Sequence, residues 1–208
     1  GAETIRQWVL SKKVSHIALV GQTEEDVRQV MIEGECGLLA CHRDDQRPVF
    51  YPSRGEVIWP NGAKATIYSA QAYDKLRGPQ FDGAWVDELA KFQYDQQTWD
   101  QLMFCLRKGA HPRVVVTTTP RPSALIKSLV AGEGKGVVVT RGSTFENKEN
   151  LAPSFLQHVQ EKYGHTALGA QELYAHILES GKDALWNWPL LEKCRKDVSP
   201  TLCRIVVA

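Results

Sequence analysis

The most informative stretch of the sequence is Phe81-Asp82-Gly83-Ala84-Trp85-Val86-Asp87-Glu88. Its apolar centre, bounded by Gly83, is typical of a fully buried strand of a parallel sheet. The carboxylates that follow would lie at the carboxyl end of that strand, where open α/β sheets bind ligands. Asp87 could hold Mg²⁺ there, largely through water, and Glu88 could orient and deprotonate a water molecule aimed at a γ-phosphate. The pattern also fits a strand followed by a helix, because the first turn of a helix favours acidic residues.

A second apolar stretch, Val114-Val115-Val116-Thr117-Thr118-Thr119-Pro120, ends in three hydroxyls and a proline. Between the two stretches, apolar residues recur at helical spacing, so the expected order is strand, helix, strand. Crossovers of this kind build parallel sheets. The hydroxyls of Thr117, Thr118 and Thr119 would then lie next to Asp87, where they could sense a γ-phosphate. The helical spacing is set by Trp99, Leu102, Met103 and Leu106.

These two stretches resemble a known family, the large subunit of the DNA-packaging terminase of tailed phages and prophages. Residues 76–92 are similar to its Walker B segment, and residues 116–120 are similar to its coupling motif. Gly1-Ala2-Glu3 resembles the start of the helix after the family's phosphate loop, and residues 204–208 resemble the strand that opens its nuclease domain. The resemblance implies an α/β fold of the P-loop NTPase (RecA/ASCE) type with ATP and Mg²⁺ as cofactors.

Arg77 precedes Gly78 on a turn ten residues before Asp87, which suggests a position close to the carboxyl rim of the sheet. The resemblance places an arginine before this glycine, and a motor ring needs an arginine that reaches the γ-phosphate held by a neighbouring subunit. A structural ion pair with Asp74 or Asp82 is the alternative.

The sequence also departs from the family, because it contains no G-x-x-x-x-G-K-[ST] motif. Residues 132–136 include a Gly-Lys pair, but no Ser or Thr follows it and a strand comes next, so a turn is expected there. The resemblance puts the phosphate loop upstream of Gly1 and the nuclease carboxylates beyond Ala208. It also puts the missing strand between residues 114–119 and an expected strand at 137–140, which should therefore run parallel without pairing directly.

The remaining pattern predicts an α/β core over residues 1–144, a linker at 145–151 and a small helical subdomain at 152–203, and the resemblance implies that the core is the motor ATPase. Within the core we expect a helix at 2–13, a strand at 17–20 and a helix that Thr23 caps and Gly34 ends. Residues 34–55 read as loop, and residues 57–68 read as a hairpin around Asn61-Gly62. Residues 204–208 would begin the next domain.

Charge and cysteine content exclude several classes of protein. The 25 Lys and Arg nearly balance the 24 Asp and Glu, giving a net charge of +1, so DNA contact needs a local patch. Arg54 and its neighbours Arg43 and Arg47 are candidates, against a solvated loop. No long apolar run or signal peptide is present, which favours a soluble, cytoplasmic protein. The resemblance implies that this cytoplasm is that of the host cell. Cys36, Cys41 and His42 offer three metal ligands without a fourth, so buried thiols are the simpler interpretation.

The resulting hypothesis is ATP hydrolysis that drives double-stranded DNA into a procapsid, in a homo-oligomeric ring with the small terminase subunit and the portal protein. Without the phosphate loop this chain alone should be inactive, and a non-catalytic remnant that only binds partners is the alternative. A DEAD-like helicase would need a second motor domain. A nuclease would use Asp82, Asp87, Glu88 and Lys91, but the spacing departs from the Glu-x-Lys of restriction-type sites.

Overall fold

The protein divides into two compact units, Gly1–Arg141 and Gly142–Ala208. We describe it from a computed structural model, in which residues 1–119, 121–164, 166–175, 177 and 193–195 are described. No helix among these residues is long and apolar enough to cross a membrane.

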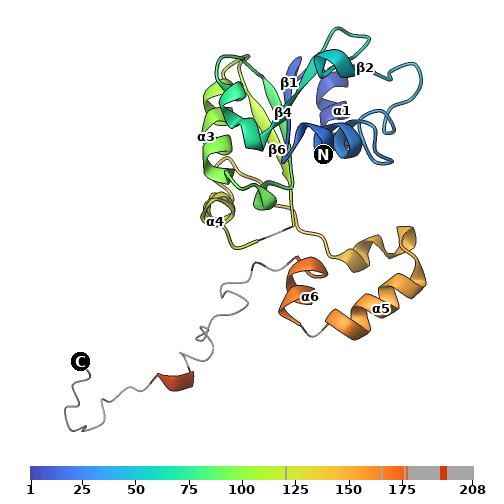
Figure 1. The fold of residues 1–208 in the computed structure, drawn as a ribbon, viewed down its shortest axis with the longest axis vertical. Coiled ribbons are helices and arrows are strands. Elements are labelled where there is room, and N and C mark those ends of the chain that lie inside the picture. The colour runs from blue at the N-terminus through green and yellow to red at the C-terminus, as the bar shows by residue number, and fades with distance from the viewer. Residues whose placement is uncertain (120, 165, 176, 178–192, 196–208) are drawn as a thin grey trace, which may run out of the picture. The chain divides into compact units, whose positions relative to one another are not determined.

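The first unit is built on a six-stranded sheet of order β2-β3-β4-β1-β5-β6 (Figure 1). Four neighbouring strands, β4, β1, β5 and β6, run parallel, whereas β2 and β3 form an antiparallel ribbon at one edge. The expected α/β fold with a mostly parallel sheet is confirmed. The strands are β1 His16–Gly21, β2 Val49–Tyr51, β3 Glu56–Ile58, β4 Lys64–Ser69, β5 Gly83–Asp87 and β6 Arg113–Thr117.

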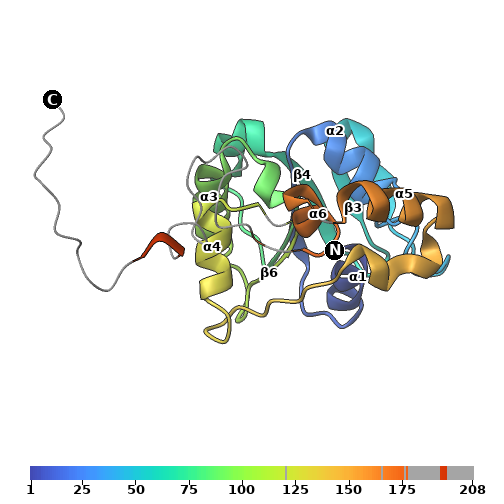
Figure 2. The same cartoon turned by 90° about the horizontal axis from the view of Figure 1, so that it is seen from below.

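Helices cover both faces of this sheet (Figure 2). On one face lie α1 (Ala2–Leu10) and α2 (Glu24–Asp26), which continues as a π-helix over Val27–Ile32. Thr23 caps α2 with a reciprocal Thr23–Asp26 capping box. On the other face lie α3 (Asp95–Cys105), which connects β5 to β6, and α4 (Ala124–Ala131). The main core packs α1 and the π-helix against the sheet through buried apolar residues that include Ile5, Val9, Ile17, Leu19 and Met31.

The two predicted strands that carry the candidate site are present and adjacent. β5 pairs with β6 in parallel, with Ala84 beside Val114 and Asp87 beside Thr117. Residues 83–86 are buried, as expected for a central strand, whereas every residue of β6 is only half-buried. Because β6 is the last strand of the sheet, its outer edge is unpaired among the described residues. Both stretches are apolar in sequence, so the sequence pattern did not predict that β5 is buried and β6 is an edge strand.

The strand predicted at residues 137–140 is absent, and the loop predicted at residues 34–55 is wrong in part. Residues 137–140 form no strand: Val137 makes a single isolated bridge to Glu133, and Val138 is 89% exposed. A strand needs a partner, and no described strand lies beyond β6 to supply one. The loop predicted at 34–55 contains the short strand β2, which pairs with β3.

The predicted hairpin joins β3 and β4, and short 3₁₀ segments follow several strands. Only Gly62 of the Asn61-Gly62 turn takes a positive φ, of 86°, while the Asn61 side chain donates to the Val9 carbonyl. The 3₁₀ segments of this unit are η2 Pro52–Arg54, η3 Ala70–Leu76 and η4 Leu89–Lys91. Residues 132–136 form the expected turn, with positive φ at Gly134 and Gly136.

The second unit is helical where it is described. It contains the 3₁₀ segment η5 (Thr144–Asn150), then α5 (Pro153–Tyr163), which starts at a proline, and α6 (Ala167–Glu172), which Thr166 caps. The predicted linker at 145–151 therefore coincides mostly with η5. The rest of the predicted helical subdomain, apart from residues 193–195, and the strand at 204–208 lie outside the described residues.

Candidate functional site

A chain of hydrogen bonds links three side chains on one face of β5 and β6. The Trp85 indole Nε1–H donates to Oγ1 of Thr117 at 2.8 Å, and the Thr117 hydroxyl donates to Oδ1 of Asp87 at 2.5 Å. Trp85 and Asp87 share a face because they are two residues apart in a strand, and the register brings Thr117 beside Asp87. Since the indole occupies a lone pair of the hydroxyl, the single proton of Thr117 is directed at the carboxylate.

The environment of Asp87 suits a hard cation. Burial raises the pKa of this carboxyl, the Thr117 hydroxyl opposes the shift, and the nearby Glu88 adds to it. A bound cation would offset that cost of burial. The available ligand is a carboxylate beside a hydroxyl, and no group of three His, Cys, Asp or Glu able to hold a metal occurs in the described part of the chain. A single carboxylate fits Mg²⁺, which keeps several of its waters.

Glu88 is held in a strained backbone conformation. Its φ of 56° and ψ of 41° lie in the left-handed region, which costs a residue with a Cβ about 1 to 2 kcal/mol. Its N–H donates to the Thr117 carbonyl at 2.6 Å, which ties the strained residue to β6. Its Oε2 is buried and lies 3.2 Å from Nζ of Lys91, in an ion pair without hydrogen-bond geometry. Strain of this kind clusters at functional sites.

The three consecutive threonines have different partners. Thr117 contacts Asp87, as described above. Thr118 accepts the Ala90 N–H at 3.1 Å and donates to the Thr119 carbonyl, so it fastens the turn that follows Glu88. The Thr119 side chain forms no hydrogen bond with the described residues. The structure therefore joins Thr117 and Thr118 to the two acidic residues and leaves Thr119 outside this network.

Arg77 lies away from this group of side chains, contrary to the expectation that it would be close to the carboxyl rim. The preceding Leu76 accepts a hydrogen bond from Cys105 at the end of α3, and Phe81, just before β5, donates to the Cys105 carbonyl. The chain has thus crossed back toward the amino end of β5 when it reaches Arg77. Arg77 is exposed and forms no ion pair with any described residue, so the predicted pairing with Asp74 or Asp82 is absent.

Asp82 has a structural role that rules out the nuclease alternative. It is 8% exposed and accepts hydrogen bonds from the Ser15 N–H, the Ser15 hydroxyl and the His16 N–H at 2.7 to 2.9 Å. It thereby joins the beginning of β1 to the beginning of β5. Asp82 and Asp87 lie at opposite ends of β5, about 16 Å apart at 3.3 Å per residue. They cannot share a metal ion.

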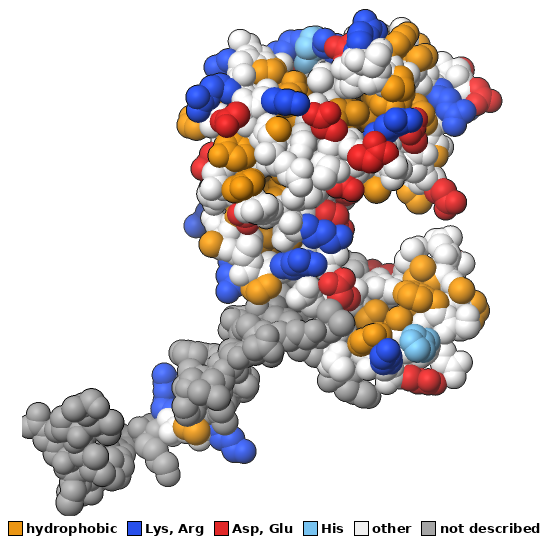
Figure 3. All heavy atoms as spheres, in the orientation of Figure 1, with side chains coloured by type: hydrophobic (Ala, Val, Ile, Leu, Met, Phe, Trp, Pro, Cys, Tyr) orange, Lys and Arg blue, Asp and Glu red, His pale blue; other side chains and the backbone are white. Residues whose placement is uncertain are grey.

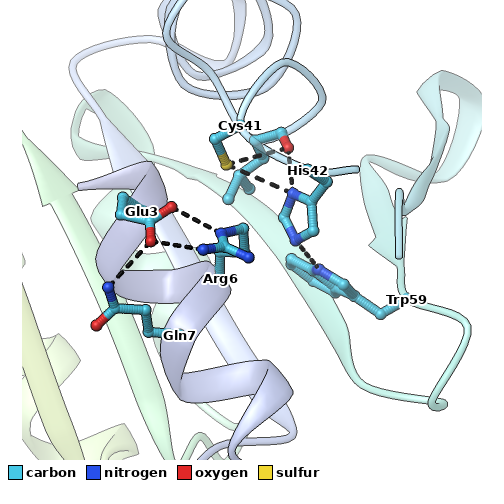
Figure 4. A network of polar contacts seen from close by, with 7 residues as sticks. Glu3, Arg6, Gln7, Cys41, His42 and Trp59 are labelled. Carbon is cyan, nitrogen blue, oxygen red and sulfur yellow. Dashed lines mark hydrogen bonds and ion pairs between the residues drawn. The ribbon is translucent and has the colours of Figure 1, made fainter. Parts of the chain in front are cut away.

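The Cys41–His42 pair belongs to a packing cluster in which His42 has no free nitrogen (Figure 4). His42 is 7% exposed; its Nε2 accepts the Trp59 indole N–H at 2.8 Å, which leaves Nδ1–H to donate to the Leu38 carbonyl at 2.6 Å. Cys41 Sγ lies 3.4 Å from Nδ1, and Cys36 is exposed. Burial is the main reason that the pKa of His42 is lowered. Both ring nitrogens are occupied, which disfavours metal binding here.

Three contacts of the site were not predicted from the sequence. Trp85 was missed as a site residue, although its two-residue spacing to Asp87 already put both on one face. Lys91 lies three residues after Glu88, a spacing at which opposite charges meet on a helical turn. Gly1 packs so closely on Trp85 that an added Cβ would come within 2.0 Å of the indole, so α1 begins beside this face of β5.

Comparisons with known proteins place this chain in a family. Residues 1–193 match the family model for the N-terminal part of the terminase large subunit, T4likevirus-type. The fold is similar to the large terminase of a thermophilic bacteriophage, with a TM-score of 0.64 at 15% identity over 85% of this chain and 45% of that one. A search of curated proteins found no match.

Two further solved structures share this fold. The same phage terminase in complex with ATP-gamma-S gives a TM-score of 0.65 at 12% identity, over 83% of this chain and 42% of that one. The large terminase ATPase domain of Thermus phage P74-26 gives 0.55 at 13% identity, over 83% of this chain and 80% of that one. This chain thus spans less than half the length of the first terminase and most of the isolated ATPase domain of the second.

Proposed function

Because this chain belongs to the family of terminase large subunits of the T4-like type, we propose that it forms most of the ATP-hydrolysing part of a DNA-packaging motor. The observation that carries the proposal is the contact between Asp87 and Thr117, with Glu88 strained beside them. It joins the proposed hydrolytic residues to the strand whose end would respond to the nucleotide. An ATP-gamma-S complex of a terminase with this fold supports the choice of nucleotide.

In this proposal each acidic residue has its own task. Asp87 holds Mg²⁺, with Thr117 orienting the carboxylate, and the metal supplies positive charge to the phosphates when it is bound. Glu88 orients the attacking water and takes its proton, and Lys91 holds the Glu88 carboxylate in place. The beginning of α1 beside Trp85 matches a helix whose N-terminal N–H groups face phosphates.

Coupling would run from the site into β6 and the turn after β5. Because Thr117 donates to Asp87, its hydroxyl would respond to metal binding at that carboxylate, and Thr118 accepts the Ala90 N–H. A change at either hydroxyl is passed directly to the backbone of the neighbouring element. Thr119, whose side chain has no hydrogen-bond partner among the described residues, is free to approach the γ-phosphate. The motor's partners in this proposal are double-stranded DNA, the small terminase subunit, the portal protein and further copies in a ring, in the host cytoplasm.

The test compares Glu88→Gln with Asp87→Asn in the complete terminase subunit. Glu88→Gln keeps the side-chain shape but removes the base, so DNA-stimulated hydrolysis should fall about 10²-fold or more while ATP binding persists. Asp87→Asn should weaken Mg²⁺ dependence and nucleotide binding together. Full hydrolysis by Glu88→Gln would show that another residue is the base.

The alternative, a scaffold that only binds partners, makes a different prediction for the 208-residue chain. Most phosphate contacts in motors of this kind come from a phosphate loop and its lysine, and the sequence contains no such motif. We therefore expect residues 1–208 by themselves to bind ATP and Mg²⁺ only weakly. Micromolar binding in a calorimetric titration would contradict this expectation.

A further inference from the structure

The amino ends of the four parallel strands carry a cluster of cations that the proposed nucleotide site does not use. Lys64 opens β4, Arg113 opens β6, and Lys12 and Lys13 lie in the connection that leads into β1. Two more cations lie in the connection that leads into β6. We call this group, Lys12, Lys13, Lys64, Arg107, Lys108 and Arg113, the amino rim. It lies at the opposite end of the strands from Asp87.

Contacts between neighbouring segments bring several members of the amino rim close together. Lys108 Nζ lies 2.5 Å from Nδ1 of His16, and His16 is directly beside Lys64 in the pairing of β1 with β4. The Arg113 guanidinium lies 5.5 Å from the centroid of the Trp8 ring, and the Lys13 N–H donates to the Trp8 carbonyl. Burial and the neighbouring Lys108 lower the pKa of His16, which agrees with a crowd of positive charge.

Little negative charge neutralises this surface. Among the described residues, two carboxylates contact this surface. Asp82 accepts hydrogen bonds from Ser15 and His16, and Glu56 forms ion pairs with both Lys64 and Arg54. Lys12, Lys13 and Arg107 are exposed and form no ion pair within the described parts of the chain. Because the net charge of the whole chain is only +1, the surplus here is a local asymmetry. Figure 3 shows lysine, arginine and histidine side chains along the upper edge of the first unit, with acidic side chains among them.

The arginines considered from the sequence are less available. Arg43 lies 3.9 Å from Asp45, Arg47 donates to the Leu39 carbonyl at 2.8 Å, and Arg54 lies near Glu56 and over the Tyr51 ring. Each of these side chains already has a partner on its own loop or ribbon. The amino rim instead holds three exposed cations that form no ion pair with the described residues, Lys12, Lys13 and Arg107. The rim is therefore a better candidate for a polyanion than these three arginines.

We propose that the amino rim binds the phosphate backbone of duplex DNA without reading its sequence. Four neighbouring strands span about 14 Å at 4.8 Å spacing, which corresponds to about four base-pair steps of 3.4 Å. Lysine and arginine at such spacing neutralise phosphates and position the duplex. The choice of DNA as the polyanion rests on the proposed packaging function, whereas the site itself rests on the charges. DNA would thus contact the sheet at the end away from the nucleotide.

The test measures binding of a duplex of about 30 base pairs of mixed sequence to the 208-residue chain by fluorescence anisotropy. The salt concentration runs from about 25 to about 200 mM, conditions in which phosphate contacts dominate affinity. The rim variant is Lys12→Glu/Lys13→Glu/Arg107→Glu. The matched control, Arg28→Glu/Lys75→Glu/Lys127→Glu, changes the net charge equally at exposed residues elsewhere in the same unit. Circular dichroism and thermal melting check that both variants fold.

We expect the rim variant to lose about 10-fold or more in affinity at low salt relative to the control, with a salt slope smaller by about 2 to 3. Equal weakening by both triples would mean that only net charge matters, and no weakening by either would exclude the rim; both results overturn the proposal. A rim variant that loses binding to poly-glutamate but not to DNA would overturn it in favour of an acidic protein partner. The assay contains no nucleotide, so failure of the ATPase proposal would not affect this measurement.

Discussion

Glu88 combines an acidic side chain with a backbone conformation that such a residue rarely adopts. Its left-handed φ is imposed by the hydrogen bond from its N–H to Thr117 and by the turn that Thr118 fastens. A sequence optimised for stability alone would place glycine or asparagine here. The presence of glutamate at a strained position is the physical argument that its carboxylate is used.

Replacing this residue should therefore separate stability from activity. Glu88→Asn should raise the free energy of unfolding by about 0.5 to 1 kcal/mol, because asparagine tolerates the left-handed region and only a weak ion pair is lost. Hydrolysis by the complete subunit should be lost. Urea unfolding gives the first quantity and a phosphate-release assay the second.

Lys12 supplies the matched control, since its φ is 55° and it is exposed far from Asp87. Lys12→Asn should stabilise the chain similarly and leave hydrolysis in the absence of DNA unchanged. A stability loss in Glu88→Asn alongside a gain in Lys12→Asn would mean that the carboxylate of Glu88, rather than its backbone, dominates folding at this site.

Thr117 should affect metal binding through Asp87. Thr117→Val removes the hydroxyl that orients the carboxylate, and residues that orient a metal ligand typically contribute about 10-fold or more to affinity. Thr117→Ser should keep the hydrogen bond and most of the affinity. Mn²⁺ binding by the complete subunit, followed by electron paramagnetic resonance, measures this independently of turnover.

Trp85→Phe provides the finer distinction, because it removes only the indole N–H that fixes the Thr117 hydroxyl. Its effect on Mn²⁺ affinity should be smaller than that of Thr117→Val and in the same direction. Unchanged affinity in Thr117→Val would show that the hydroxyl does not position Asp87.

At the scale of secondary structure, the sequence predicted those elements whose signal is local. β5, α3 and β6 are where periodicity placed them, Thr23 caps α2 as predicted, and the hairpin joins β3 to β4. Asp87 and Thr117 could be brought together in advance because the carboxyl ends of parallel strands meet. Trp85 could not be assigned its hydrogen bond, since register and side-chain reach are set only in three dimensions.

The wrong predictions concern segments whose structure depends on contacts with other parts of the chain. Val137-Val138-Val139 has the composition of a strand, but the outer edge of β6 is unpaired in the described structure and no ladder forms there. β2 was missed because it is only three residues long and its pairing with β3 comes from the tertiary structure. Arg77 was misplaced because spacing along the chain does not reveal that the crossover after η3 returns to the amino end of β5.

The loop between the π-helix and β2 should respond to acid through His42. Because burial lowers the pKa of His42 in the folded state, the unfolded chain takes up the proton first as the pH falls below about 6.5. The contribution of neutral His42 to the free energy of unfolding is therefore fully present above that pH and decreases below it. Protonation also puts a proton on Nε2, which then opposes the indole N–H of Trp59.

Urea unfolding at pH values of about 7.5 and about 5.5, on either side of the ordinary pKa of histidine, tests this prediction. The free energy of unfolding should fall between the two, and His42→Gln should reduce that fall, whereas His111→Gln, at an exposed residue, should leave it unchanged. An identical loss in the wild type and in His42→Gln would assign the acid sensitivity to other groups, among which His16 has its pKa shifted in the same direction.

At the scale of the whole molecule, the position of Arg77 bears on the proposed ring of subunits. An arginine exposed at the amino end of β5 lies away from Asp87 of its own chain, so a role in hydrolysis has to be played on a neighbouring subunit. An arginine supplied in this way is worth about 10³ to 10⁵ in kcat. We therefore expect Arg77→Ala to spare ATP binding by one complete subunit and to abolish hydrolysis by the assembled ring, with Arg28→Ala as a control at an exposed arginine.

Mixing two inactive variants tests directly whether Arg77 acts on a neighbouring subunit. Arg77→Ala subunits keep Glu88, and Glu88→Gln subunits keep Arg77, so about a quarter of the interfaces in a randomly mixed ring pair an intact glutamate with an intact arginine. DNA-stimulated phosphate release should then reappear in the mixture and depend on the mixing ratio, with a maximum near equal amounts. If no turnover returns although both variants assemble on DNA, Arg77 does not act across the interface. Because Arg77 pairs with neither Asp74 nor Asp82, it would then need a different partner.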